Sequence, residues 1–101
     1  MSFQKTESAP APREQQFNSD AVQAIFFVTA ASDPGMVQRL VEPFSKLGLV
    51  PARVHISSED GTGEEITADL RVAGLTRETA HLVDKALRRI VGVRQVIAHA
   101  E

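Results

Sequence analysis

The sequence predicts a single α+β sandwich, in which two helices cover one face of a four-stranded antiparallel sheet. Apolar residues recur at helical spacing in two segments and alternate at strand spacing in others. Glycine, proline or capping residues separate these segments. The 101 residues leave room for one such domain. We expect it to span 21–101, after a flexible tail over 1–20 that is rich in Gln, Glu, Ser and Pro.

The first two elements are expected to be a strand and a helix. The segment 24–30 (AIFFVTA) is short, apolar and rich in β-branched and aromatic residues, which predicts a strand. The helix should begin at Asp33, whose carboxylate can cap free N–H groups, with Pro34 in the first helical position. It should end at Gly48, and Pro43 should bend its axis. Its apolar stripe comprises Met36, Val37, Leu40, Val41, Phe44 and Leu47.

The remaining elements are expected to be a hairpin, a helix and a strand. Segments 50–57 and 65–72 both alternate, with a glycine-rich turn between them, which indicates two antiparallel strands. Thr76 should cap a helix that Gly92 stops, and 93–99 should be the last strand. The order βαββαβ, with right-handed crossovers, is that of the ferredoxin-like sandwich. The strand residues expected to face inward are Val50, Ala52, Val54, Ile56, Ile66, Ala68, Leu70 and Val72.

The face of the sheet without helices should be polar on the hairpin and apolar on the first strand. Its polar residues are expected to be Arg53, His55, Thr67, Asp69 and Arg71. The first strand has apolar residues on both sides, because Ile25 and Phe27 alternate with Phe26 and Val28. A central strand with two apolar faces indicates that a second copy covers part of this face. We therefore expect a homodimer.

Composition argues against several classes of function. The net charge of −2 gives no electrostatic reason to bind nucleic acid or a membrane surface. No apolar run could span a bilayer or act as a signal peptide, which predicts a cytoplasmic protein. The chain has no cysteine, and its histidines (His55, His81 and His99) lie in separate elements, so we expect no metal site and no cofactor. Without a catalytic constellation, we expect no enzyme activity.

This sequence lacks the residues that characterise several other proteins of the same topology. RNA-recognition domains stack bases on aromatic side chains of the open face, but 66–72 (ITADLRV) contains none. Copper chaperones need paired cysteines, and acylphosphatases need an arginine in the first loop. This sequence has neither. In contrast, the segment 33–49 resembles the hallmark of the ACT domain: Asp33-Pro34-Gly35, a hydrophobic pair, and a helix ending in glycine before the second strand. The resemblance covers roughly 22–101.

The resemblance implies a ligand site at the start of the first helix, with Asp33, Pro34, Gly35 and Met36 as the binding residues. Unpaired N–H groups and the positive end of the helix dipole suit a carboxylate. Gly35 would allow a ligand to approach the backbone closely, and Asp33 would meet an ammonium group. From the residues alone, Asp-Pro-Gly can equally be a favourable way to start a helix. Pro43, and Val37 where leucine is commonest, depart from the family pattern.

Within the family, the chain is similar to the short regulatory subunits of acetohydroxyacid (acetolactate) synthase, through its length and the pattern of 82–96. That resemblance implies an amino-acid-sensing, allosteric domain that binds a small-molecule amino acid, branched-chain ones first, and regulates a catalytic subunit in amino-acid biosynthesis. The alternative is a ligand-free protein-interaction or oligomerisation module on the same fold.

Overall fold

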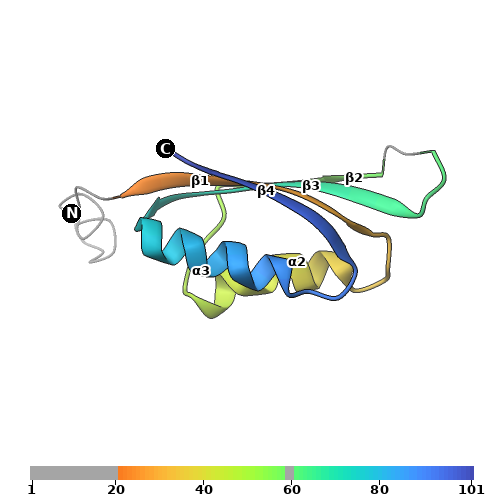
Figure 1. Ribbon diagram of the computed structural model, residues 1–101, viewed down its shortest axis with the longest axis horizontal. Helices are drawn as coiled ribbons and strands as arrows, with labels where there is room; N and C mark the ends of the chain where they lie inside the picture. The colour runs from red at the N-terminus through yellow and green to blue at the C-terminus, as the bar shows by residue number, and fades with distance from the viewer. Residues whose placement is uncertain (1–20, 59–60) are drawn as a thin grey trace, which may run out of the picture.

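The computed structural model describes residues 21–58 and 61–101, and it has both helices on one face of a four-stranded antiparallel sheet (Figure 1). The strand order is β2-β3-β1-β4, so the predicted ferredoxin-like βαββαβ sandwich is confirmed. The predicted tail over 1–20 lies outside the described residues. The elements are β1 (Val22–Ala31), α2 (Met36–Lys46), β2 (Arg53–Ser57), β3 (Glu65–Leu75), α3 (Arg77–Arg88) and β4 (Val93–Ala100).

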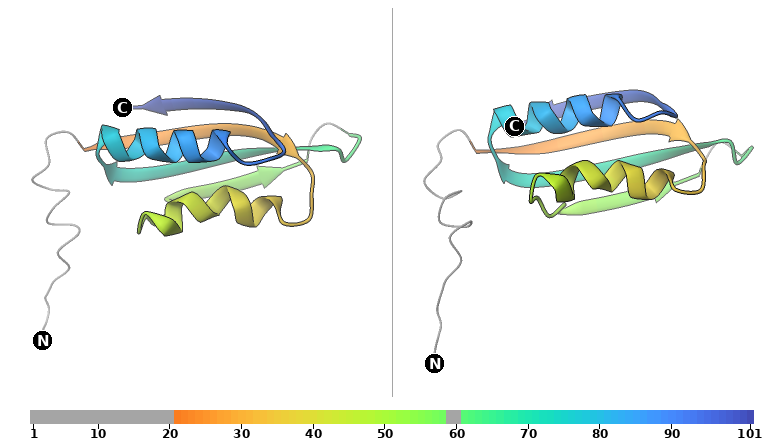
Figure 2. Two further views of the ribbon diagram at one scale, coloured as in Figure 1. Left: turned by 60° about the horizontal axis from the view of Figure 1, so that its bottom comes forward. Right: turned by 90° about the horizontal axis from the view of Figure 1, so that it is seen from below.

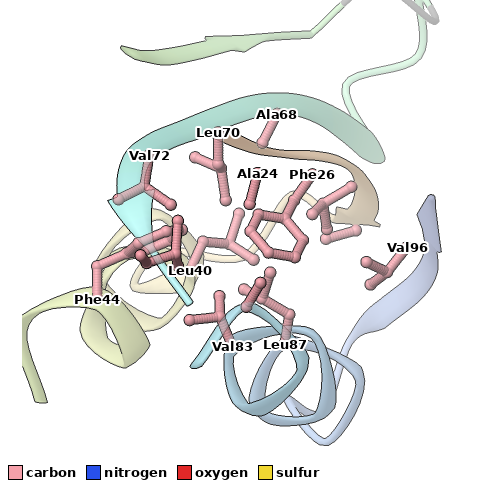
Figure 3. Close-up of a cluster of buried hydrophobic side chains, with 14 of the residues drawn as sticks. Ala24, Phe26, Leu40, Phe44, Ala68, Leu70, Val72, Val83, Leu87 and Val96 are labelled. Atoms are coloured by element: carbon pink, nitrogen blue, oxygen red, sulfur yellow. The ribbon is translucent and has the colours of Figure 1, made fainter. Parts of the chain in front are cut away.

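The core lies between the sheet and the two helices, which run side by side beneath it (Figure 2). Phe26 of β1 is at its centre, paired with Leu70 of β3 and Ala98 of β4. Its ring meets that of Phe44 edge-on, with centroids 6.1 Å apart (Figure 3). Each large side chain buried in this way contributes roughly 1.5–3 kcal/mol. Among the described residues, no polar or charged residue is buried, so apolar packing holds the two layers together.

Strand β2 is shorter and more exposed than the sequence pattern predicts. It begins at Arg53 rather than Val50, and Pro51, which has no N–H, precedes it. Val50 was expected to face inward but is 85% exposed, and Val54 is 46% exposed. The reason is position, because β2 is an edge strand with only β3 beside it and few contacts with the helices. Only Ile56 of this strand packs against the core.

The two helices end in different ways. Gly48, at φ 72°, ends α2 as predicted: its N–H donates to Ser45 O (3.1 Å) and the Leu49 N–H donates to Phe44 O (2.8 Å), which together form a Schellman motif. Helix α3 instead ends at Arg88, before Gly92, which corrects the prediction that Gly92 stops it. Gly92 lies in the following turn, where the Val93 N–H donates to Ile90 O (3.1 Å). Helix α2 continues through Pro43, and the Pro43 side chain is buried.

Candidate functional site

The site begins with a tight turn between β1 and α2. The Met36 N–H donates to Asp33 O over 3.0 Å, and Gly35 has φ 117° at the third position of that turn. Proline second and glycine third are the residues that a type II turn favours. This corrects the predicted helix start: Gly35 is the N-cap residue, and α2 begins at Met36. Asp33 makes no capping hydrogen bond, because the turn places it three residues before the helix.

The N-terminus of α2 is therefore open. No side chain caps it and its first turn contains no acidic residue. Within residues 21–58 and 61–101, the N–H groups of Val37 and Gln38 have no hydrogen-bond acceptor. Both residues are exposed, as are Asp33, Pro34 and Gly35. Unpaired N–H groups at the positive end of a helix attract anions. The structure thus brings Asp33, Pro34 and Gly35 to one exposed helix start.

Met36 has a different position from the other three residues predicted for the site. Its side chain is fully buried, and its N–H is already bonded within the turn. A Cβ atom added to Gly92 would lie 2.6 Å from Met36 Cε, so the methionine packs directly on that glycine. The Met36 side chain consequently anchors the turn to the core and does not reach the exposed surface of the site.

A second loop, between α3 and β4, holds the turn in place. The Ala31 N–H donates to Gly92 O over 2.8 Å, which ties the end of β1 to this loop. Arg39 Nη1 donates to Val91 O over 3.2 Å, so the guanidinium bridges α2 and the loop. The same guanidinium lies 3.7 Å from the place that a Cβ of Gly35 would occupy. Sequence reasoning did not single out Arg39, because the segment that it contacts is 52 residues away along the chain.

Exposed apolar side chains lie at both ends of α2 and on the segment that leads into β2. Val37 in the first turn of α2 is 47% exposed and Leu47 at its end is 40% exposed. Val50 and Val54, on the segment that leads into and along β2, are exposed as well. We call these four residues the α2–β2 apolar edge. Exposed apolar residues close to a free edge strand are typical of surfaces that meet another protein.

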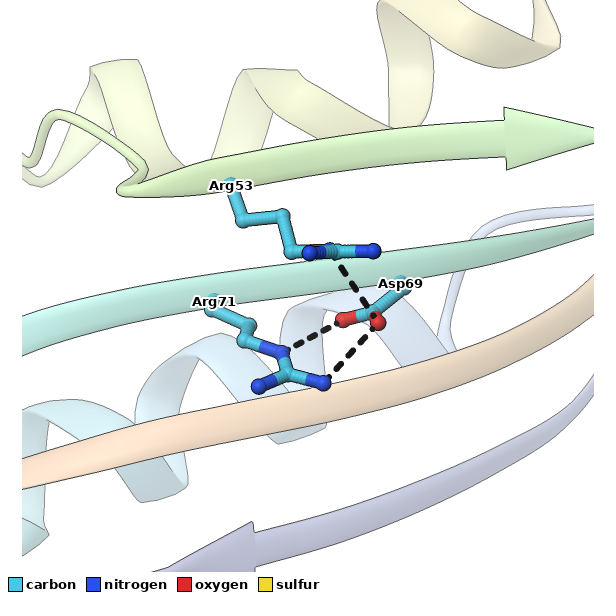
Figure 4. Close-up of polar contacts among 3 residues, drawn as sticks. All are labelled: Arg53, Asp69 and Arg71. Atoms are coloured by element: carbon cyan, nitrogen blue, oxygen red, sulfur yellow. Dashed lines mark hydrogen bonds and ion pairs between the residues drawn. The ribbon is translucent and has the colours of Figure 1, made fainter.

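The open face of the sheet carries a three-residue ion cluster. Asp69 of β3 accepts two hydrogen bonds from Arg71, Nε to Oδ1 (2.9 Å) and Nη2 to Oδ2 (3.1 Å), and lies 3.4 Å from Arg53 Nε (Figure 4). The hydrogen bonds from Arg71, together with the positive charges of Arg71, Arg53 and His55, hold the pKa of the Asp69 carboxyl below its usual value of 3.8, against an opposing effect of burial. The contact with Arg53 joins β2 to β3, whereas the contacts with Arg71 run along β3 itself.

An apolar patch lies beside this ion cluster on the same face. Phe27 of β1 is 44% exposed and Ile97, its partner on β4, is 54% exposed. Ile25, two residues along β1, is only 9% exposed, because residues on both neighbouring strands shade it. Of the two apolar sets that the sequence predicted for β1, the one on the open face is therefore Ile25 and Phe27. A depression of about 280 Å³ runs beside them, between Phe27, His55, Asp69 and Ile97.

Two other kinds of site are absent from the part of the chain that the structure describes. Over 21–58 and 61–101, no three histidines or carboxylates converge as metal ligands would. In the same part of the chain, neither helix has the length and apolar character needed to cross a membrane.

The fold is a ferredoxin-like α+β sandwich, and its particular form is shared with solved ACT domains. No family model and no curated protein sequence matches the chain. Among solved structures, the ACT domain from the GTP pyrophosphokinase of Chlorobium tepidum is similar in its crystal structure, with a TM-score of 0.66 and 16% identity over 78% of this chain and 99% of that one. The solution structure of that domain is also similar, with a TM-score of 0.59 and 22% identity over 76% and 84% of the two chains.

A third similar structure is the ligand-free regulatory subunit of aspartate kinase from Thermus thermophilus. The TM-score is 0.57 and the identity 12%, over 80% of this chain and 52% of that chain. The chain therefore spans about half of that subunit. These structures confirm the ACT fold that the motif at 33–49 predicted, and the identities are too low to carry function with it.

Proposed function

We propose that this chain is a regulatory domain without chemistry of its own, which binds a free amino acid at the N-terminus of α2. One observation carries the proposal. The exposed start of α2 has no capping side chain and no acid in its first turn, and the N–H groups of Val37 and Gln38 are unpaired within 21–58 and 61–101. A helix that leaves these groups open offers them to an anion.

The chemistry of the turn suits both charged groups of an amino acid. Its carboxylate would accept hydrogen bonds from the Val37 and Gln38 N–H groups, at the positive end of the helix. Its ammonium group would meet Asp33, whose exposed carboxylate makes no capping bond. Gly35 leaves the approach to the backbone open. The half-exposed Val37 side chain favours an apolar amino acid, and among these the branched-chain ones.

A second copy of the chain is the proposed neighbour of this site. The α2–β2 apolar edge includes Val37, so a copy packed there would meet the ligand and bury exposed apolar area at once. The resulting homodimer would pass the ligand signal to a catalytic enzyme subunit. The similarity to short regulatory subunits of acetohydroxyacid synthase makes that enzyme the first partner to test, and amino-acid biosynthesis the first context.

The test is a thermal-shift screen of the purified chain with each of the twenty amino acids at millimolar concentration. A ligand that binds only the folded state adds about 2.7 kcal/mol of stability at one hundred times its Kd. We expect the branched-chain amino acids to raise the Tm most. The absence of a shift with all twenty would contradict the proposal, and so would a chain that remains monomeric with and without them.

Two matched glycine variants separate binding from folding. Gly35 and Gly48 both have positive φ, and an added Cβ is not crowded at either position. Both Gly35→Ala and Gly48→Ala should therefore lower the Tm through backbone strain. Only the Gly35 variants, Gly35→Asp above all, should abolish the shift with amino acids. An equal ligand response in Gly35→Asp and Gly48→Ala would overturn the assignment of the site.

The second candidate function is a protein-interaction module that binds no amino acid. The extent of the α2–β2 apolar edge favours it, since Val50 alone is 85% exposed. It predicts no thermal shift with amino acids, together with co-purification of an enzyme. Val50→Lys and Val54→Lys should abolish that co-purification. The sensor predicts both the thermal shift and the association, so the pair of measurements separates the two functions.

A further inference from the structure

A second groove lies on the helix side of the sheet, between α3 and β4. Its volume is about 210 Å³. The start of α3, the start of β1 and the end of β4 lie together at one end of the sandwich, and α2 starts at the opposite end (Figures 1 and 2). The residues that line it are Ala24, Phe26, Arg77, Ala80, His81, Asp84, Ala98, His99 and Ala100.

Small side chains on three elements create this groove. Ala80 of α3, Ala24 of β1 and Ala98 of β4 leave space that larger residues would fill, and Phe26 contributes an apolar floor. Ala98 pairs with Phe26 in the sheet and points toward the helices, yet it is exposed. Helix α3 therefore does not close over the end of β4. The groove is apolar at its base and open to solvent at its rim.

The titratable residues at the rim of the groove are Arg77, His81, Asp84 and His99, and His99 Nε2 lies 4.0 Å from Glu101 Oε1. Arg77 is exposed, and within 21–58 and 61–101 it has neither an ion-pair nor a hydrogen-bond partner on its side chain. His81 lies one helical turn further along α3, on the same side. Asp84 is held by Arg88, Nε to Oδ1 at 2.9 Å, so its charge is already compensated. The cation left over is the guanidinium of Arg77.

The free edge of β4 adds backbone groups to this rim. Glu101 and Gln23 exchange both backbone hydrogen bonds, each 2.9 Å long. Because bonded and non-bonded pairs alternate in an antiparallel ladder, Ala98 and Ala100 direct their N–H and C=O groups away from β1. Arg88 Nη2 donates to Val96 O (2.8 Å), which satisfies the corresponding outward carbonyl of Val96. The N–H groups of Ala98 and Ala100 remain as donors beside the groove.

We propose that the α3–β4 groove is a binding site for a small aliphatic carboxylate. The carboxylate accepts a charge-assisted bidentate hydrogen bond from Arg77, with His81 beside it, and the short apolar chain lies on Ala24, Ala80 and Phe26. The deaminated acids that correspond to branched-chain amino acids have this chemistry. This site is separate from the one at the start of α2 and does not depend on it, because the two sets of lining residues have no member in common.

An NMR titration of the full chain with 3-methylbutanoate tests the groove. We expect saturable amide shifts centred on Ala80, His81 and Ala98, with a Kd of about a millimolar. The neutral 3-methylbutanamide should bind about tenfold more weakly, because it loses the charge-assisted bond. Acetate should also bind at least tenfold more weakly, since each CH2 withdrawn from the apolar base costs about fourfold in affinity.

Variants assign the binding to the groove. Arg77→Gln should weaken 3-methylbutanoate about tenfold, whereas Arg89→Gln, which removes an exposed arginine outside the groove, should not change the affinity. Ala98→Leu fills the groove from an exposed strand position and should abolish binding without loss of fold. Gly35→Asp should leave this affinity unchanged, which separates the groove from the site on α2. Non-saturating shifts, shifts centred on Val37 and Gln38, or equal affinities for Arg77→Gln and Arg89→Gln would each overturn the proposal.

Discussion

Helices α2 and α3 occupy equivalent places in the two βαβ halves of the sandwich, but they begin in different ways. Thr76 caps α3, with its Oγ1 accepting from the Thr79 N–H at 3.1 Å, and Glu78 adds an acidic residue to the first turn. Helix α2 begins at Gly35 with neither a capping side chain nor an acid. The first turn of α3 thus has its own capping side chain, whereas the first turn of α2 has none.

This difference shows that two helices in equivalent positions are stabilised by different interactions. A side-chain cap contributes about 1 kcal/mol, and α2 forgoes it. Helix α2 is fixed instead by buried side chains, Met36, Leu40 and Phe44, and by a C-terminal Schellman motif. Its first turn can consequently stay open without loss of the helix. The buried Met36 side chain, in the first turn of α2, holds the turn before the helix against the core.

The largest expected effect comes from Gly92, which supports the turn before α2. Gly92→Val combines a positive φ of 100° with a Cβ 2.6 Å from Met36 Cε, so we expect a loss of about 3 kcal/mol, from backbone strain and overpacking together. Gly48→Val, which meets no atom within 4 Å, should lose about half as much. Urea denaturation measures both. Equal losses in the two variants would show that the contact between Met36 and Gly92 does not stabilise the turn.

A smaller effect should distinguish the two helix starts directly. Thr76→Ala removes the cap of α3 and should lower the free energy of unfolding by about 1 kcal/mol. Asp33→Ala, at the position where the sequence placed a cap for α2, should change it by less than about 0.5 kcal/mol, because Asp33 caps nothing. A large loss for Asp33→Ala in thermal or urea unfolding would mean that α2 is capped after all.

Giving α2 the acid that α3 already has should stabilise the domain and impair the site. Gln38→Glu places a negative charge in the first turn, where the helix dipole makes it favourable by about 0.5 kcal/mol. The same charge repels an incoming carboxylate, so the Tm shift with amino acids should shrink. Val41→Glu is the control, because it adds the same charge in the middle of the helix. If both variants kept the full ligand response, the carboxylate would not bind at this helix start.

The smallest effect lies on the open face, away from both helix starts. The pKa of Asp69 is lowered chiefly by its hydrogen bonds from Arg71, so the folded state holds the charged form more tightly than the unfolded chain does. Its stabilising contribution is complete above the unfolded pKa of about 3.9 and is lost as pH falls through the lower folded value. Asp69→Asn should therefore lose less stability than the parent chain between about pH 5 and pH 2.

Arg71→Gln provides the complementary measurement, since it removes the donor and keeps the carboxyl. It should flatten the acid side of the stability curve in the same direction as Asp69→Asn. An unchanged acid dependence in both variants would show that charges on the helix side of the sheet, and not the open-face cluster, govern acid sensitivity.

Local patterns predicted the elements and their order, because each depends on neighbouring residues. Alternation over 65–72 and the stripe through Leu40 and Phe44 sufficed for β3 and α2, and Thr76 was recognised as a cap. The errors lie where a distant contact decides. Val50 has the pattern of a buried strand residue, but it is exposed because β2 is at the edge of the sheet.

For the candidate site, the sequence determined that a helix starts close to Asp33-Pro34-Gly35, since proline and glycine restrict the backbone locally, but it placed that start two residues too early. Only the tertiary structure decided that Met36 is buried on Gly92 and that Arg39 bridges to Val91, because these contacts join segments more than fifty residues apart. The groove between α3 and β4 is likewise a feature that only the tertiary structure decided. Its alanines come from three elements, and a space left by small side chains exists only once those elements pack together.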